Sequence, residues 1–110
     1  MCIRDRPNTV FAVVIENQAD ETVGMGRVIG DNGLFFQIVD IAVDPAHQGR
    51  GLGKAIMKAL VDHLRATVPA EAYISLIADG EAHRLYAQYG FQPTAPNSIG
   101  MALFLRPNEA

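Results

Sequence analysis

The stretch from Val39 to Leu60 limits most strongly what this chain can fold into. Val39, Ile41 and Val43 alternate as the residues of a buried strand do, and Pro45 ends that strand because proline cannot continue a hydrogen-bonded ladder. From there to Leu60, apolar residues recur at steps of three and four, which is typical of an amphipathic helix. The stretch therefore predicts a strand, a short loop and a helix in direct succession.

A cluster of glycines marks the turn from this strand into the helix. Gly49, Gly51 and Gly53 lie there, together with the basic residues Arg50 and Lys54. The first N–H groups of a helix have no partner inside the helix, and the helix dipole adds partial positive charge. Glycine lets an anion approach these amides closely. The cluster favours a pyrophosphate site, although tight packing alone also explains a glycine-rich turn.

The order of residues around the glycines excludes two common phosphate-binding patterns. The P-loop pattern fails because Gln48 stands at its first glycine and Ala55 at its magnesium-binding hydroxyl. The dinucleotide pattern fails because Lys54 stands at its third glycine. The pattern that fits is Gln-x-x-Gly-x-Gly, formed by Gln48, Gly51 and Gly53. With its strand and helix, this loop resembles the acetyl-coenzyme A site of the GNAT superfamily of acyltransferases.

Composition agrees with a globular chain and excludes several other classes. With 110 residues, 49% hydrophobic and 19% charged, the chain has room for one domain with a single core. A formal net charge of −3 argues against a nucleic-acid partner, which needs a basic face. No apolar run reaches the roughly 18 residues of a membrane span, so no membrane partner is expected. The single cysteine, Cys2, suits a cytoplasmic location, and no residues have metal-ligand spacing.

The first part of the chain predicts an antiparallel meander. Residues 1–9 form an arm without pattern. Apolar and β-branched residues then indicate strands over 10–15, 22–29 and 34–43, separated by segments rich in Asn, Asp and Gly that are typical of turns. The third strand leads directly into the glycine loop.

The second part of the chain predicts an α/β arrangement. A helix over 51–67 and a strand over 72–78 complete a βαβ crossover, which places the new strand parallel to the third one. Asp79 is predicted to cap a second helix over 81–89. A last strand is predicted over 101–105. The whole is a mixed sheet, an antiparallel meander followed by a βαβ crossover, with helices on its faces.

The resemblance to GNAT acyltransferases covers the chain from about Val10 to Leu105 and implies the same fold. The second signature of the family, a tyrosine on the last helix followed by Gly-Phe, matches Tyr86, Gly90 and Phe91. Family domains open with a further strand and two short helices that supply the acceptor-binding loop. The domain over 10–110 is therefore expected to be N-terminally incomplete, or else a minimal member.

The resemblance also implies acetyl-coenzyme A as the co-substrate. A bulge in the strand over 34–43 would part it from its parallel neighbour, so that the pantetheine arm lies alongside and the Ile41 N–H meets the thioester oxygen. Asp79 stands where many members carry a cofactor-binding asparagine, although a carboxylate cannot donate the same hydrogen bond. The expected cofactor-binding residues are Ile41, Ala42, Val43, Gln48, Gly49, Arg50, Gly51, Leu52, Gly53, Lys54 and Asp79.

Tyr86 is the expected catalytic residue, acting as general acid. Its phenol, with an ordinary pKa near 10, holds a proton for the departing thiolate at neutral pH. Helical spacing alone would make Tyr86 a core residue, and the family signature favours the catalytic role. The general base stays unidentified, since Gln37 stands where histone-acetylating members carry a glutamate and Asp40 is a weak candidate.

The resemblance thus implies an N-acetyltransferase that moves an acetyl group to the primary amine of a small molecule by direct attack on the thioester. The alternative is a non-catalytic or incomplete acetyl-coenzyme A-binding module, which the missing N-terminal segment favours. The sequence does not name the acceptor. Self-association is also expected, as a homodimer or as an aggregate, because the strand from Val10 to Ile15 would form a sheet edge that no charge or proline protects.

Overall fold

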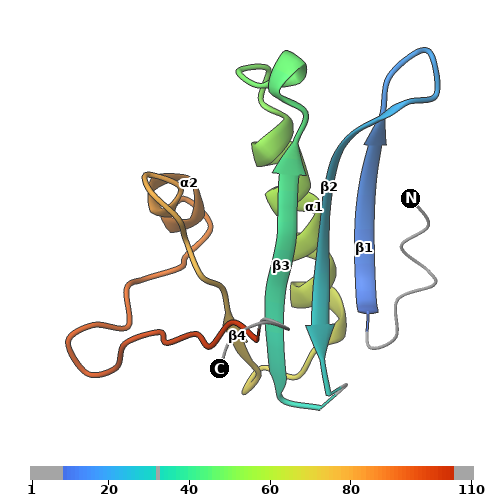
Figure 1. Ribbon diagram of the computed structural model, residues 1–110. Helices are drawn as coiled ribbons and strands as arrows, with labels where there is room; N and C mark the ends of the chain where they lie inside the picture. The colour runs from blue at the N-terminus through green and yellow to red at the C-terminus, as the bar shows by residue number, and fades with distance from the viewer. Residues whose placement is uncertain (1–8, 32, 106–110) are drawn as a thin grey trace.

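The computed structural model describes residues 9–31 and 33–105 of the chain. These residues form a four-stranded sheet in the order β1-β2-β3-β4 with helices packed beside it (Figure 1). The first three strands are antiparallel neighbours and β4 runs parallel to β3, so the predicted mixed α/β sheet is confirmed. The elements are β1 (Thr9–Glu16), β2 (Thr22–Gly30), β3 (Phe35–Val43), the 3₁₀ helix η2 (Pro45–His47), α1 (Leu52–Thr67), β4 (Tyr73–Ser75) and α2 (His83–Ala87).

Helix α1 covers one face of the sheet (Figure 1) and supplies five of the eight described residues of the buried core. Its apolar side chains recur at helical spacing, as the sequence predicted, and they pack against buried side chains of β2 and β3. Gly26 of β2 allows this close approach, because a Cβ there would lie 2.6 Å from Ile56 Cγ2. The buried core consists of Val28, Phe36, Ile38, Ile56, Met57, Leu60, Val61 and Leu64.

Strand β1 forms one edge of the sheet, as predicted, and α1 covers one of its faces. Phe11 packs on the core and stacks on His63 of α1, with ring centroids 3.7 Å apart. Val14 on the other face is 41% exposed. Thr9 belongs to β1 and not to the predicted N-terminal arm, and residues 1–8 of that arm lie outside the described residues.

Two predicted elements are shorter than expected. Strand β4 covers Tyr73–Ser75 and not 72–78, because it pairs with β3 over these three residues alone. Helix α2 begins after Ala82, and Asp79 is not its cap: the Asp79 backbone C=O accepts from the Ala82 N–H at 3.1 Å. The reason is a turn at Gly80, whose φ of +56° separates Asp79 from the helix.

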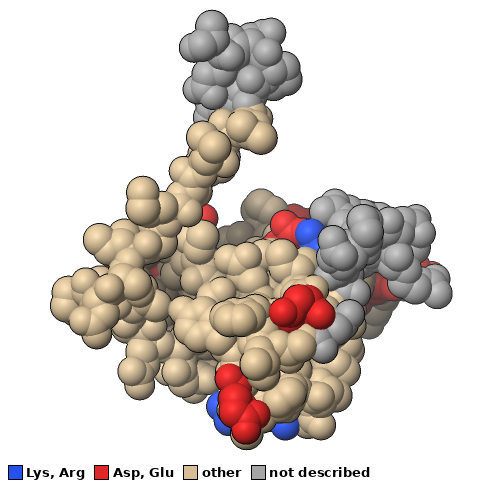
Figure 2. Space-filling model, turned by 90° about the horizontal axis from the view of Figure 1, so that it is seen from below, with Lys and Arg blue, Asp and Glu red and all other residues tan. Residues whose placement is uncertain are grey.

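The predicted last strand is wrong, and the second helix ends at Ala87 and not at residue 89. Gly90, three residues beyond this end, has a left-handed backbone with a φ of +96°. Residues 101–105 form no strand, and the side chains of Met101 and Leu103 are 90% and 83% exposed. Figure 2 shows that the end of the described chain extends away from the rest of the molecule. An apolar pattern indicates which residues suit a strand, but a strand also needs a backbone partner.

Candidate functional site

Strands β3 and β4 separate soon after they meet. Their parallel pairing runs only from Phe35 opposite Tyr73 to Gln37 opposite Ser75. The chain then leaves the sheet and rises toward α2 (Figure 1). Within the described residues, the second half of β3 therefore has no strand on that side.

A bulge in β3 lies where the two strands part. Arg27 of β2 pairs with Val39, and Met25 pairs with Ala42, so that two residues of β3 stand opposite one residue of β2. The first of the two, Asp40, has a φ of +58°, in the left-handed region that Asp and Asn enter more readily than most residues. The bulge that the family resemblance implied is confirmed.

The bulge reverses which residues of β3 direct their backbone N–H and C=O groups away from β2. We call the side of β3 that faces away from β2, beyond the end of β4, the open side. Before it, the Leu34 C=O accepts from the Tyr73 N–H at 2.7 Å, so even-numbered residues face β4. After it, the Asp44 N–H donates to the Val23 C=O at 2.8 Å, so even-numbered residues face β2. Because successive strand residues alternate in direction, Ile41 directs its N–H away from β2, toward the open side.

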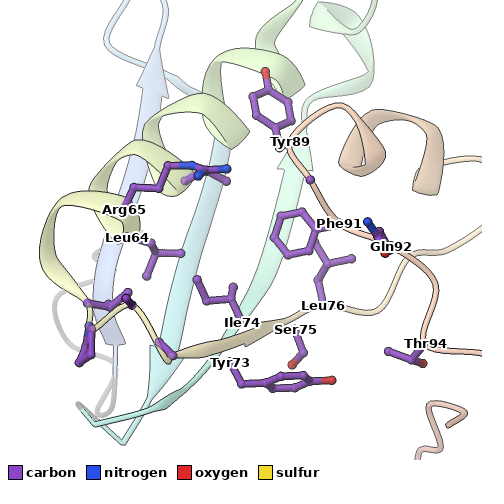
Figure 3. A pocket seen from close by; sticks show the side chains of 16 residues that line it. Leu64, Arg65, Tyr73, Ile74, Ser75, Leu76, Tyr89, Phe91, Gln92 and Thr94 are labelled. Atoms are coloured by element: carbon purple, nitrogen blue, oxygen red, sulfur yellow. The ribbon is translucent and has the colours of Figure 1, made fainter. Parts of the chain in front are cut away.

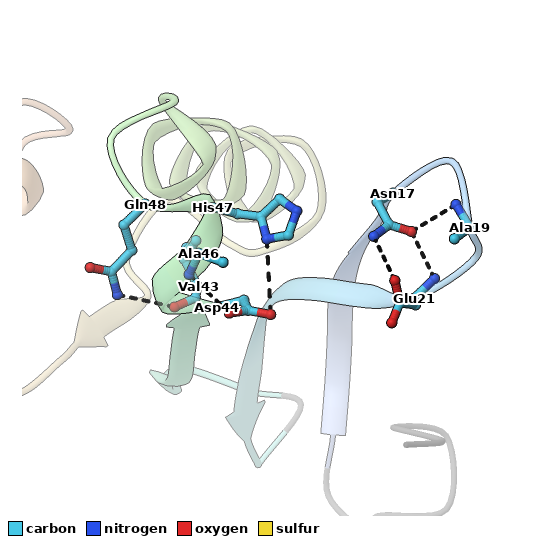
Figure 4. A network of polar contacts seen from close by, with 8 residues as sticks. All are labelled: Asn17, Ala19, Glu21, Val43, Asp44, Ala46, His47 and Gln48. Carbon is cyan, nitrogen blue, oxygen red and sulfur yellow. Dashed lines mark hydrogen bonds and ion pairs between the residues drawn. The ribbon is translucent and has the colours of Figure 1, made fainter.

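The loop after β3 is held by its own side chains (Figure 4). Asp44 Oδ1 accepts from the Ala46 N–H at 3.0 Å, and His47 Nδ1 lies 3.9 Å from Asp44 Oδ2. Gln48 Nε2 donates to the Val43 C=O at 3.1 Å, which agrees with Val43 facing the open side, like Ile41. Gln48 therefore has a structural role in the loop, and its contact with a cofactor stays a prediction.

The next residues have the geometry that an anion site requires. Gly49 and Gly51 have φ angles of +82° and +78°, and a Cβ on either would meet nothing within 4 Å. Gly51 begins α1 without a side-chain cap, so the first-turn amides from Leu52 to Lys54 have no partner inside the helix. Arg50 and Lys54 are exposed beside this open space.

Gly53 differs from the other two glycines because it faces Leu85 of α2 and not open space. A Cβ on Gly53 would lie 3.4 Å from Leu85 Cδ2. The Tyr89 hydroxyl donates to the Lys54 C=O at 3.0 Å, so Tyr89 has a structural role. These contacts dock α2 on the first turn of α1. Tyr86, on the same helix, packs half-buried against the core.

The surroundings of Tyr86 favour the protonated form of its phenol. Burial raises the pKa of Tyr86 above its ordinary value, and the negative charge of Asp79 raises it further. A protonated phenol is the form that donates to a departing thiolate. The sequence did not reveal this link between Asp79 and Tyr86, because it depends on the turn between β4 and α2.

We expect Tyr86 to lose its proton only above about pH 10, where an ordinary phenol titrates. The pKa of Tyr86 is higher in the folded chain than in the unfolded chain. The protonated phenol therefore stabilises the fold fully at a pH below the unfolded-state pKa, and this stability is lost as the pH rises through the folded-state pKa. Asp79→Asn should move the titration to lower pH. The measurement is the tyrosinate absorbance of the chain minus that of Tyr86→Phe. Titration of Tyr86 near neutral pH would contradict this expectation.

A cavity of about 670 Å³ lies apart from the loop, between the second half of α1, β4 and residues 89–94. Leu64, Ile74 and Phe91 point toward its middle, and Arg65 extends along its rim (Figure 3). None of the predicted cofactor-binding residues lines it. Its lining is mainly apolar, whereas a pyrophosphate needs amides and cations, so the glycine loop is the better candidate for such a ligand.

Neither a helix able to span a membrane nor a side-chain cluster able to hold a metal ion occurs in residues 9–31 and 33–105. No helix in these ranges is both long and apolar enough to cross a bilayer. No group of three or more His, Cys, Asp and Glu side chains in the same ranges is arranged to hold a metal ion.

The parted strands, the bulge and the glycine loop before a helix together define the acyltransferase type of α/β fold. Comparison with known families agrees, because residues 7–93 match the family model described as "Acetyltransferase (GNAT) domain". The chain belongs to the GNAT acetyltransferase family.

Individual relatives support this assignment. The chain is 36% identical over 87 residues to GCN5-related N-acetyltransferase 2, chloroplastic, of Arabidopsis thaliana, covering 78% of the chain but only 33% of that relative. A solved probable acetyltransferase of unknown function from meticillin-resistant Staphylococcus aureus is 43% identical with a TM-score of 0.85, covering 93% of this chain and 76% of that one. YhbS of Escherichia coli, solved in complex with CoA, shares the fold at 19% identity and a TM-score of 0.65, over 81% and 49% of the two chains.

Proposed function

We propose that this chain is an acetyl-coenzyme A-dependent N-acetyltransferase that acts on a primary amine. The bulge in β3 is the observation that supports this most, because it directs the Ile41 N–H toward the open side of the strand. A loop of left-handed glycines and an uncapped helix follow directly, with the geometry that suits a pyrophosphate. Membership of the GNAT acetyltransferase family supports the same activity.

The pyrophosphate of the co-substrate would bind at the loop of residues 49–54. The first-turn amides of α1 would donate to it, since they have no partner inside the helix. Open space in front of Gly49 and Gly51 allows its approach. Arg50 and Lys54 would add positive charge, which the helix dipole supplements. Salt should weaken this part of the binding, because both side chains are exposed.

The pantetheine arm would lie along Ile41, Ala42 and Val43 as an added strand. The side of β3 that faces away from β2 offers it backbone groups, as a free sheet edge does for a peptide. Bound acetyl-coenzyme A supplies an activated acyl carbonyl and a thiolate leaving group. The Ile41 N–H would donate to the carbonyl oxygen as negative charge develops there, which is the role of an oxyanion hole.

Tyr86 would donate its proton to the departing sulfur. A phenol is protonated at neutral pH, and the raised pKa of Tyr86 extends the protonated range to higher pH. The general base for the amine stays unassigned. Gln37 cannot accept a proton as a carboxylate does, and Asp40 is engaged in an ion pair with Arg27 at 2.6 Å.

We propose a small-molecule primary amine as the acceptor, and an amine on a protein or peptide is the competing class. Curated relatives include proteins named as a histone acetyltransferase of Glycine max and as N-alpha-acetyltransferase RimI of Mycobacterium tuberculosis. A thiol-release assay with acetyl-coenzyme A should include a polyamine, an arylalkylamine, an amino sugar, a lysine peptide and a peptide with a free N-terminus. Turnover of peptides alone would contradict the small-molecule proposal.

The same assay separates catalysis from binding alone. A non-catalytic acetyl-coenzyme A-binding module would bind the co-substrate in calorimetry and release no thiol with any amine. A binding module without catalysis is the second candidate function because the chain covers only about a third of the Arabidopsis relative.

We also propose a homodimer through the outer edge of β1. That edge carries no charged residue or proline from Val10 to Ile15, and Val14 is 41% exposed beside it. Light scattering after gel filtration, over a dilution series, should show twice the monomer mass, and Val14→Lys should shift the equilibrium toward monomer. A constant mass of 11.9 kDa for the unmodified chain would contradict the proposal.

A cytoplasmic location, with neither nucleic acid nor membrane as partner, stays a proposal from composition. Some plant relatives are named as chloroplastic, so location has to be measured. A fluorescent fusion observed in the source cell tests it, and signal confined to an organelle or a membrane would contradict it.

A further inference from the structure

An ion pair joins the bulge in β3 to the neighbouring strand. Arg27 of β2 donates from Nε to Asp40 Oδ2 at 2.6 Å. The Arg27 side chain is 14% exposed and the Asp40 side chain is 42% exposed. A hydrogen bond between two charged groups is shorter and stronger than a neutral one, most of all where water is partly excluded.

Asp40 is also the residue that carries the unusual backbone of the bulge. A left-handed φ of +58° is unfavourable for a residue with a side chain, and such a conformation persists where the surroundings hold it. The carboxylate of Asp40 is thus tied to β2 at the same residue whose backbone changes the direction of β3. Arg27 pairs with Val39, so it lies directly beside the bulge.

The core fixes the register of the bulge but not its local geometry. Ile41 and Val43, after the bulge, pack on the same core as Phe36 and Ile38 before it. A strand without the bulge would turn Ile41 and Val43 away from this core, so their packing opposes a slip of register. The backbone angles at Asp40, one residue before the Ile41 N–H, depend in addition on what holds the Asp40 side chain.

We propose that Arg27 is a positioning residue for acyl transfer: by holding Asp40 in the bulge, it sets the direction in which Ile41 presents its N–H to the thioester carbonyl. The inference rests on the proposed function and adds to it a residue outside the predicted site. Arg27 touches neither the co-substrate nor the acceptor in this scheme. It acts through Asp40.

The first test measures the thioester carbonyl itself. Acetyl-coenzyme A labelled with ¹³C at the carbonyl is bound to the chain, and its C=O stretch is recorded by difference infrared spectroscopy. In Arg27→Met the band should move to higher frequency, because a misdirected Ile41 N–H donates a weaker hydrogen bond. The affinity for coenzyme A, which lacks the carbonyl, should stay within about threefold, since the pyrophosphate site is unchanged.

Turnover gives a second readout. With an accepted amine, Arg27→Met should lower kcat by about 10–100-fold with little change in the KM for acetyl-coenzyme A, as expected for a displacement of a group that acts mainly in the transition state. Asp40→Asn keeps an acceptor oxygen, and asparagine tolerates the left-handed backbone, so kcat should fall less in Asp40→Asn than in Asp40→Ala. Arg27→Met combined with Asp40→Asn should lower kcat no more than Arg27→Met alone, because the first change already removes the contact through which Asp40 is held.

Lys58→Met is the matched control. Lys58 Nζ and Asp62 Oδ2 also lie 2.6 Å apart, in an ion pair on the exposed face of α1. Losing that pair should leave the carbonyl frequency and kcat as they are. A wild-type carbonyl frequency in Arg27→Met would overturn the positioning role, even if the variant were less stable. Failure of the unmodified chain to bind acetyl-coenzyme A would overturn the proposed function, and this inference with it.

Discussion

Replacing Tyr86 by phenylalanine is expected to lower kcat by roughly 10²–10⁴-fold, the usual contribution of one well-placed proton donor. The substitution removes a single oxygen from a half-buried ring, so the packing of α2 should survive. The Kd of acetyl-coenzyme A should hardly change, because the hydroxyl acts on the sulfur as it departs. Thiol release with an accepted amine gives kcat, and calorimetry gives Kd.

Tyr89→Phe makes the same chemical change three residues further along the chain, just beyond α2, and serves as the control. It removes the hydrogen bond from the Tyr89 hydroxyl to the Lys54 C=O. We expect a loss of stability of about 1 kcal/mol, the usual net contribution of one such bond, and a kcat close to that of the unmodified chain. Equal kcat values for Tyr86→Phe and the unmodified chain would contradict the catalytic role of Tyr86 and leave it a purely structural one.

Gly51→Val is expected to abolish binding of acetyl-coenzyme A at concentrations that saturate the unmodified chain. A branched side chain at Gly51 would enter the open space in front of the α1 amides. Binding at 100 times Kd should stabilise the unmodified chain by about 2.7 kcal/mol. This gain in thermal stability should be absent from the variant. Calorimetric titration and thermal unfolding, each with and without the ligand, measure the two effects.

Gly51→Val also strains the backbone, since Gly51 has a φ of +78° and valine is unfavourable there. The variant should therefore be less stable even without ligand. Gly90→Val is the matched control, because Gly90 has a φ of +96° and an added Cβ has open space up to Arg65 Nη2 at 3.9 Å. The Gly90→Val variant should be less stable than the unmodified chain but should bind acetyl-coenzyme A with the same affinity. Equal affinities of Gly51→Val and the unmodified chain would refute the site.

The elements that local pattern specifies were predicted well from the sequence. The meander, α1 and the glycine loop follow from alternation, helical spacing and turn residues, which act over a few neighbours. The bulge has a local signal too. Phe36 and Ile38 share one face of β3 with Ile41 and Val43, so the apolar alternation skips one residue at Asp40. The prediction of the bulge nevertheless came from the family resemblance and not from this break in the pattern.

The parts that depend on distant contacts were predicted poorly. Asp79 has the chemistry of a helix cap, but the turn at Gly80 moves it away and places its charge near Tyr86. Residues 101–105 have the pattern of a strand and pair with nothing in the described structure. The Arg27–Asp40 ion pair joins residues on two different strands. No spacing along the chain reveals such a contact, because it arises from the register of β2 against β3.

Titration of the ¹⁵N-labelled chain with acetyl-coenzyme A, followed by amide NMR, tests the central claim most directly. The loop and the open side of β3 are predicted to bind the two ends of one ligand. The largest shifts should therefore fall on the amides of Gly49, Gly51 and Ile41. Shifts centred instead on Leu64 and Phe91, which line the separate cavity, would contradict the account, as would a spectrum that does not change.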